Sequence, residues 1–367
     1  MNSLSIDKGR ILVYRLFDVA HEIDLATMES RARKGVKRLR LSKHTYMEAL
    51  EFNDPPVSLE LDGFAMPLFG KELTVCVIAK AYDFGVISIA FDITIPHGTS
   101  FEALETAAIS LDMDELNHII AREYCHNLVK DLGDAVIDPY IKDEFEEEYM
   151  IFYIEKLDRE MDALEFFKKY DPSKLLLYET RQVSHYARAE TLKHRFSYYP
   201  DDFVVVHLDN ALVMEPSGSL DIPDLLEFAT AQILELRYYD NVLDKEMAWI
   251  YSEIPKNKSA SIFKLRNYEK LAKKIIYTIT DLTAVTEKVD NALKVTEDVY
   301  YAKIYKTAMI LFQGKAWEDS IRGKLATVTD AYKMICDEIS TNKGHILELW
   351  IIILIVIEII LLIVIEW

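Results

Sequence analysis

Cysteine is scarce in this chain, and its spacing forms no motif. Three cysteines occur among 367 residues, Cys76, Cys125 and Cys336, and no two of them form a CxxC pair. This spacing excludes zinc ribbons and thioredoxin-like redox sites. An odd number of widely spaced cysteines favours a reducing compartment over the secreted space.

The common phosphate-binding and nucleophile motifs are missing as well. The sequence contains no GxxxxGK[ST], GxGxxG, GxSxG or HExxH pattern. The first two motifs cradle phosphates with backbone amides, the third exposes a nucleophilic serine, and the fourth binds zinc. These absences argue against a hydrolase or a nucleotide-binding domain. We therefore expect no enzymatic activity, no catalytic residues and no cofactor.

Positive charge is in the minority. The chain has 42 Lys and Arg against 61 Asp and Glu, a formal net charge of −19. Because phosphate backbones bind positive surfaces, nucleic acid is not the expected partner.

One segment, residues 31–44, departs from this balance. It lies in a stretch, residues 24–50, for which we expect a mostly helical structure. Its charges are a solvated helix face paired with the chain's own acids, a contact for anionic lipid or RNA, or a small-anion site. No aromatic residues are interleaved to favour RNA. The candidate residues of this lipid or anion patch are Arg31, Arg33, Lys34, Lys37, Arg38, Arg40 and Lys43.

Proline is absent beyond residue 262, and the pattern there is helical. Apolar residues recur at heptad spacing, which predicts a coiled-coil-like stalk over residues 262–347, interrupted at Phe312-Gln-Gly314. The stalk is an antiparallel hairpin within one chain, or a hairpin that also contacts other copies. The seam residues are Leu271, Ile275, Thr278, Leu282, Val285, Val289, Ala292, Thr296 and Val299 in the first segment, and Ile321, Leu325, Val328, Tyr332, Ile335, Ile339 and Ile346 in the second.

The longest apolar run closes the printed sequence. Residues 349–365 contain a single polar interruption, Glu358. A helix of that length spans about 25 Å, enough for the hydrocarbon core of a bilayer. We predict a single C-terminal transmembrane helix, in preference to a buried core helix. Trp350 and Glu348 flank it, and an acid such as Glu358 inside a span faces protein or water, or is simply protonated.

The segment before residue 255 alternates strand and helix patterns, which predicts an α+β fold. Strands are expected over residues 10–18, 57–61, 72–82, 84–95, 149–155 and 203–214. Helices are expected over 156–169, 181–196 and 223–251, and one helix or a helix pair over 100–132. Residues 1–255 form the expected cytosolic domain, with a possible division near 135–150. The N-terminus resembles neither a signal nor a transit peptide. The expected location is therefore the cell (inner) membrane, single-pass, with this domain in the cytoplasm.

One helical stretch holds a weak pair of candidate metal ligands. Asp114 and His118 are four residues apart, so a helix would place them on one face, as metal ligands require. An ordinary amphipathic helix with solvated charges is the alternative.

Three segments carry a resemblance to a known family. They are YDFGVISIAF at 82–91, LRYYDNVLDKEMAWIY at 236–251 and LELWIIILIVIEII at 347–360. Together they resemble the "required for meiotic nuclear division" (Rmd/Sif/YagE) membrane-protein family, of which this chain would be a divergent prokaryotic member. The resemblance implies a membrane-anchored α/β domain without established catalytic residues.

The sequence therefore predicts a non-catalytic, self-assembling scaffold held at the membrane by its C-terminal anchor. The expected partners are membrane lipids, other copies of the chain and a protein that the sequence does not identify. The alternative is an oligomeric ion-conducting or gating protein in which Glu358 faces a polar axis.

Overall fold

The computed structural model describes residues 4–32, 38–39, 55–140, 145–253 and 298–365, with several residues between 268 and 280. The chain divides into two compact units. The first comprises Met1–Tyr238 and Asn291–Lys315, and the second Tyr239–Asp290 and Ala316–Trp367. The predicted domain boundaries at 255, 262 and 347 remain predictions.

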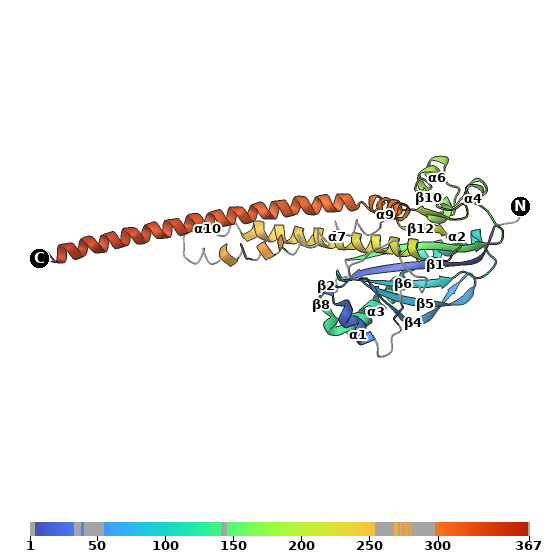
Figure 1. Ribbon diagram of the computed structural model, residues 1–367, viewed down its shortest axis with the longest axis horizontal. Coiled ribbons are helices and arrows are strands. Elements are labelled where there is room, and N and C mark those ends of the chain that lie inside the picture. The colour runs from blue at the N-terminus through green and yellow to red at the C-terminus, as the bar shows by residue number, and fades with distance from the viewer. Residues whose placement is uncertain are drawn as a thin grey trace. The chain divides into compact units, whose positions relative to one another are not determined.

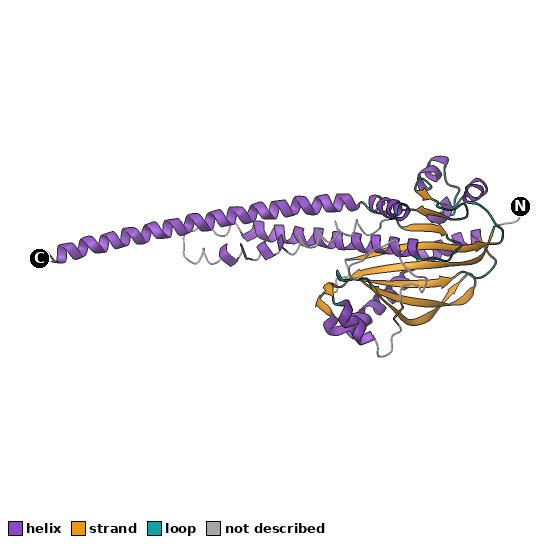
Figure 2. Ribbon diagram, viewed as in Figure 1, coloured by secondary structure: helices purple, strands orange, loops and turns teal. Residues whose placement is uncertain are grey.

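A single mixed sheet is the framework of the first unit (Figures 1 and 2). Every neighbouring pair along its path is antiparallel except β9 with β12, which is parallel. In sheet order the strands are β10 (Arg195–Phe196), β11 (Phe203–Val206), β12 (Asn210–Met214), β9 (Glu146–Leu157), β1 (Ser5–Asp18), β6 (Val86–Thr94), β5 (Lys71–Ala81), β4 (Val57–Leu68) and β3 (Arg38–Leu39), with β7 (Thr99–Ser100) paired to β1.

Helices account for most of the remaining described residues. A two-stranded sheet of β2 (Ala20–Ile23) and β8 (Val136–Pro139) and a short 3-10 turn, Gly133–Ala135, complete the unit. The helices are α1 (Leu25–Ala32), α2 (Phe101–Asp112), α3 (Glu115–Leu132), α4 (Ala163–Lys169), α5 (Ser173–Leu176), α6 (His185–Thr191), α7 (Asp221–Glu253), α9 (Val299–Leu311) and α10 (Gly314–Ile365).

The central strands bury both of their faces. Side chains alternate across a strand, so β1 sends Ile11 and Val13 to one face and Leu12 and Tyr14 to the other, and all four are buried. The first face packs on α2 and α3, whose residues share one core with it. The second face is covered by the part of α7 in the first unit, where the rings of Tyr82 and Phe228 meet, and by α9, whose Tyr305 contacts Phe228.

Local signals explain where the helices break. The Ser100 hydroxyl accepts a hydrogen bond from the Ala103 amide at 3.2 Å and so caps α2. The Asp114 carboxylate accepts one from the Leu116 amide at 2.9 Å and caps α3, which ends at Gly133 with φ 51°. The stretch 100–132 is therefore a helix pair.

The second unit joins the end of α7, helical residues between 268 and 280, and α10. Lys324 on α10 pairs with Asp240 at 2.8 Å and Asp244 at 2.7 Å, and Lys343 pairs with Glu269 at 3.0 Å. Residue numbers increase in the same direction on both sides of these ion pairs. Helix α10 therefore runs parallel to α7 and to the helical residues between 268 and 280. The second predicted seam is buried at Ile321, Val328 and Ile335 and less covered at Leu325, Tyr332, Ile339 and Ile346.

The mixed α+β prediction is confirmed, as is the long C-terminal helix. Three local predictions were wrong. Residues 38–39 form strand β3 inside the stretch expected to be helical, since they pair with β4. Helix covers only the second half of 156–169 and only seven residues of 181–196.

A further correction concerns the first stalk segment. Asp298 has an extended backbone and caps a new helix at Val299, so the heptads do not continue through it, and Val299 is exposed. The antiparallel hairpin as a whole stays a prediction, because residues 281–297 lie outside the described part of the chain.

Gly85, in the turn between β5 and β6, generates a stability prediction. Its φ is 93°, and a Cβ there would lie 1.8 Å from the carbonyl oxygen of Ala20. We expect Gly85→Ala to lower the free energy of unfolding by about 2–4 kcal/mol. Gly98→Ala is the matched control, because φ is 77° there and no atom lies within 4 Å, so we expect a loss of about 1 kcal/mol. Urea unfolding followed by circular dichroism measures both, and equal losses would contradict the steric argument.

Candidate functional site

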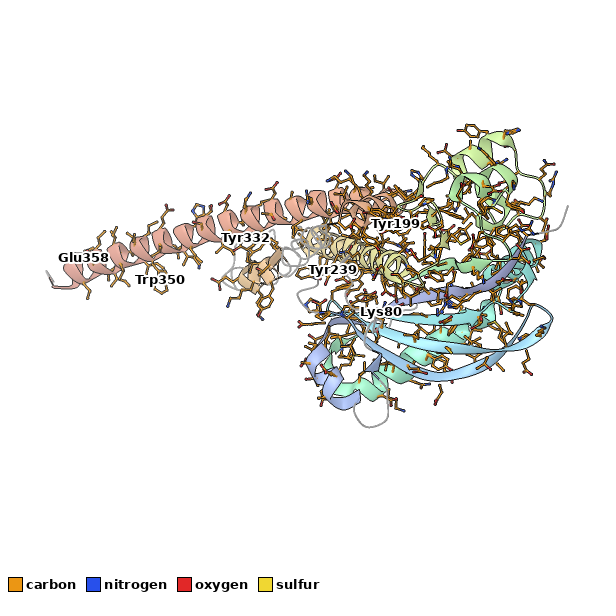
Figure 3. The ribbon with its side chains drawn as sticks, turned by 45° about the vertical axis from the view of Figure 1, so that its right-hand side comes forward. Lys80, Tyr199, Tyr239, Tyr332, Trp350 and Glu358 are labelled. Carbon is orange, nitrogen blue, oxygen red and sulfur yellow. The ribbon has the colours of Figure 1, made fainter. Side chains whose placement is uncertain are left out.

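The apolar end of α10 is the first candidate site. This helix is long enough and apolar enough to cross a membrane, and none of its most apolar stretch is buried. Trp350 is 57% exposed, and Glu358 is also exposed (Figure 3). Glu348 lies 3.4 Å from His345 one turn earlier on the same helix. By its length and composition this helix could cross a membrane, and no described residue covers its most apolar stretch.

The predicted basic patch lies mostly outside the described residues. Arg31 lies in the last turn of α1, and Arg38 pairs with Leu59 across β3 and β4. Arg33, Lys34, Lys37, Arg40 and Lys43 belong to residues that the structure does not describe. The patch therefore stays a prediction.

The two candidate metal ligands have other partners. Asp114 caps α3, as described above. His118 Nε2 lies 3.1 Å from Glu146 and 2.9 Å from the Arg122 guanidinium, and Arg122 also bonds Glu146 at 3.2 Å. No group of three His, Cys, Asp or Glu side chains within the described residues is arranged to hold a metal ion.

A buried ion cluster lies between the sheet and α7. Lys80 on β5 points to the second face of the sheet, and its side chain is 8% exposed. Its ammonium bonds Asp224 at 2.8 Å and also contacts the Glu227 carboxylate, whose side chain is 1% exposed. Tyr14 and Tyr82, both buried, complete the surroundings. Figure 3 shows Lys80 within the first unit. We call Lys80, Asp224 and Glu227 the lysine clamp.

The charges in the lysine clamp are unequal, one cation against two carboxylates. Burial by itself lowers the pKa of Lys80, but Asp224 and then Glu227 outweigh it and raise that pKa above its ordinary value. Burial raises the pKa of Glu227, Lys80 opposes this, and Asp224 adds to it, so the pKa is raised overall. Lys80 therefore stays protonated at neutral pH.

This electrostatic state decides what the lysine clamp can do chemically. A nucleophilic lysine must lose its proton, which needs a lowered pKa. The raised pKa of Lys80 is the opposite condition, so the clamp is suited to fixing α7 on the sheet. The buried thiol of Cys125 is equally unsuited to nucleophilic chemistry, because burial raises its pKa to about 12.

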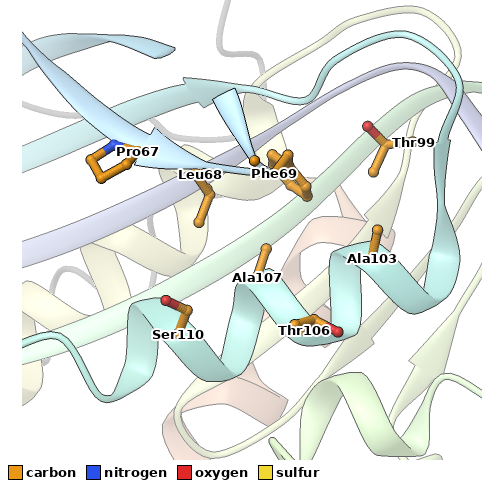
Figure 4. Close-up of a pocket in the computed structure, with 9 residues that line it drawn as sticks. Pro67, Leu68, Phe69, Thr99, Ala103, Thr106, Ala107 and Ser110 are labelled. Atoms are coloured by element: carbon orange, nitrogen blue, oxygen red, sulfur yellow. The ribbon is translucent and has the colours of Figure 1, made fainter. Parts of the chain in front are cut away.

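A groove of about 650 Å³ lies between the β4–β5 hairpin and α2 (Figure 4). It contains no ionisable side chain, and its threonines already donate their hydroxyls: Thr99 to the Pro96 carbonyl at 2.5 Å and Thr106 to the Glu102 carbonyl at 3.0 Å. It therefore offers no general acid or base. The lining residues are Pro67, Leu68, Phe69, Gly70, Thr99, Ala103, Thr106, Ala107 and Ser110.

Sequence reasoning missed the lysine clamp. Lys80 lies in a strand pattern that reads as apolar on both faces, and its partners are 144 and 147 residues away. The signal was the lysine itself, a charge inside a doubly apolar strand. Two acids in the first turn of a helix, Asp221 and Asp224, look like ordinary helix-start residues.

The lysine clamp generates a prediction. Lys80→Met leaves two buried carboxylates without a cation, so we expect a loss of about 3–5 kcal/mol in the free energy of unfolding. Glu227→Gln is the matched variant: it keeps the Lys80–Asp224 pair, and we expect a much smaller loss.

The pH dependence gives a second readout. Without Lys80 the folded-state pKa of Glu227 rises further, so protonation favours the folded state and stability falls as the pH rises through that pKa. The deficit of Lys80→Met relative to the wild type should therefore shrink between pH 7 and pH 5. A deficit that grows as the pH falls would contradict the clamp.

Comparison with known proteins assigns the first unit to a family. A family model described as "Uncharacterized protein MJ0711, N-terminal domain" matches residues 8–220, more than half of the chain. Protein MJ0711 of Methanocaldococcus jannaschii is 25% identical over 230 residues, which are 62% of this chain and 69% of that protein. No solved structure matches.

These findings overturn the resemblance to the Rmd/Sif/YagE family. Its three segments were a hydrophobic strand, a helix and an isoleucine-rich run, and the last two lie outside the matched residues. Patterns of this kind follow from burial in a sheet or from an apolar helix, so unrelated families share them. The chain belongs to the family defined by the N-terminal domain of the uncharacterized protein MJ0711.

Proposed function

We propose that this protein is a membrane-anchored, self-assembling scaffold whose first unit binds a partner in the cytoplasm. The exposed apolar end of α10 carries the proposal. Burying one Ile or Leu side chain stabilises by about 1.5–3 kcal/mol. Leaving a dozen or so in water would cost on the order of 20 kcal/mol, so lipid or another protein surface must cover them.

The residues around this run support a lipid cover. Trp350 lies at the start of the run, where an indole ring favours the membrane interface. Lys343 and His345 precede it, in the place where positive residues mark the cytoplasmic side. We therefore assign the first unit to the cytoplasmic face of the cell membrane, with α10 as the single span.

The sites described above favour binding over catalysis. The lysine clamp holds its cation protonated, and the groove beside α2 has no ionisable lining. A tethering protein needs neither a reactive lysine nor an ionisable groove. It needs a rigid domain, an anchor and a surface for a partner.

The anchor generates a test. Ile355 and Ile359 are 49% and 51% exposed and lie four residues apart on α10. Replacing both with Arg adds about 5–7 kcal/mol to the cost of insertion, so we expect the protein to leave the membrane fraction. Arg at Ser340 and Gly344, an exposed pair with the same spacing before the apolar run, is the control and should stay membrane-bound. Carbonate extraction of membranes measures both, and release of both variants alike would refute the anchor.

Self-assembly has its own measurement. We expect light scattering of the full-length protein in mild detergent, corrected for bound detergent, to give the mass of a discrete oligomer. A monomer would exclude both self-assembly and a pore. Because Glu358 is exposed within the apolar stretch, an ion-conducting oligomer is the second candidate. Glu358→Gln would change ion flux in liposomes if the protein conducts, whereas a scaffold would assemble and bind unchanged after Glu358→Leu.

A further inference from the structure

Four tyrosines gather in the first unit, where the loop between β10 and β11 meets the start of α9. The ring centroid of Tyr198 lies 4.9 Å from that of Tyr199 and 5.4 Å from that of Tyr300. Tyr300 and Tyr301 are 5.5 Å apart, and every pair is edge-on. We call these four residues the tyrosine cluster; Figure 3 labels Tyr199 within it.

The cluster is a surface feature. Tyr198 and Tyr199 are 64% and 62% exposed, while Tyr300 and Tyr301 are half-buried behind them. Edge-on packing leaves ring faces open on one side, and open ring faces carry partial negative charge. Neighbouring tyrosines from two distant segments therefore present a shared aromatic surface to the solvent.

Carboxylates hold the cluster in place. Buried Asp202 accepts hydrogen bonds from the backbone amides of Tyr198 at 2.7 Å and Tyr199 at 3.0 Å. Asp298 caps α9 by accepting from the Tyr300 amide at 2.7 Å. The Tyr301 hydroxyl donates to Asp221 at 3.3 Å. The backbone that carries the rings is thus held in place, and the Tyr301 ring is held through its hydroxyl.

The same acids give the surface its charge. Burial raises the pKa of Tyr300, and Asp202, Tyr301, Glu215 and Asp298 raise it further. Burial also raises the pKa of Tyr301, with Asp221 as the next cause. Each of these neighbours acts in the same direction because each is negative when ionised. The ring faces and the carboxylates therefore attract the same kind of ligand.

That ligand is an organic cation. Guanidinium and ammonium groups bind to tyrosine faces, and nearby carboxylates strengthen the attraction. Phosphate and nucleic acid would be repelled. A bare metal ion needs open carboxylate oxygens, whereas those of Asp202 are both engaged by backbone amides. Arginine fits best, because its planar group stacks on a tyrosine ring while the nearby carboxylates attract its charge.

We propose that the tyrosine cluster, with Asp202, Glu215, Asp221 and Asp298 behind it, is the docking surface for an arginine-rich segment of a partner protein. The inference names the partner class of the proposed scaffold and in that sense rests on it. Binding at the cluster does not itself require the anchor, so the two are separable by experiment.

The test uses the full-length protein in detergent micelles and the peptide acetyl-(Gly-Arg)4-amide, with binding followed by calorimetry. We expect the wild type to bind this peptide and to bind acetyl-(Gly-Glu)4-amide not at all. Tyr199→Ala should weaken binding by about tenfold, since one desolvated cation–ring contact is lost. Tyr199→Phe should bind nearly as the wild type does, because the ring face remains. Glu215→Gln should bind about threefold more weakly, from the loss of one charge.

Tyr186→Ala is the matched control. Tyr186 is 80% exposed on α6 and has no part in the cluster, so this variant should bind like the wild type. Absence of arginine-peptide binding, equal losses in Tyr199→Ala and Tyr186→Ala, or a tenfold loss in Tyr199→Phe would each overturn the docking surface. Carbonate extraction of the same variants keeps the two proposals apart: a protein that binds peptide but leaves the membrane refutes only the anchor, and one that stays in the membrane without binding refutes only the cluster.

Discussion

The central strands of the sheet are apolar on both faces, and most of the fold follows from the need to cover them. Helices α2 and α3 cover one face with an ordinary apolar core. The other face takes α7 and α9, from parts of the chain more than 80 residues beyond those two helices. The sheet therefore cannot be completed locally. Its second face joins segments far apart in the sequence into the first unit.

Apolar burial alone does not fix the position of a helix along a flat sheet. The lysine clamp fixes the position of α7, because Lys80 bonds both Asp224 and Glu227, which lie three residues apart on that helix. A shift of α7 by one residue would rotate both carboxylates away and leave three buried charges unpaired. The unequal charge is tolerated because the cation is bonded to both acids at once. Positional specificity, more than net stability, is what such a cluster provides.

Local patterns predicted the parts that depend on local physics. Alternation and turn residues located β5, β6 and β12. The predictions that failed concern structure that depends on residues distant in the sequence. Arg38, for example, is in a strand because β4 lies beside it. The lysine clamp and the tyrosine cluster bring together residues about 100 or more positions apart, Lys80 with Glu227 and Tyr198 with Tyr300. No spacing rule connects such pairs. The heptads were real on α10 but did not continue across Asp298, where one capping bond outweighs periodicity.

The family match ends at residue 220, and α7 begins at residue 221. During synthesis, every strand of the sheet therefore leaves the ribosome before the helix that covers its second face. Translation adds about 5–20 residues per second, so that face, with Tyr14 and Lys80 on it, waits for seconds to be covered. A fragment that ended at residue 220 would lack α7 and α9, so the second face of its sheet would stay uncovered. Because α7 and α9 cover this face, residues outside the recognisable family domain complete the core of the first unit.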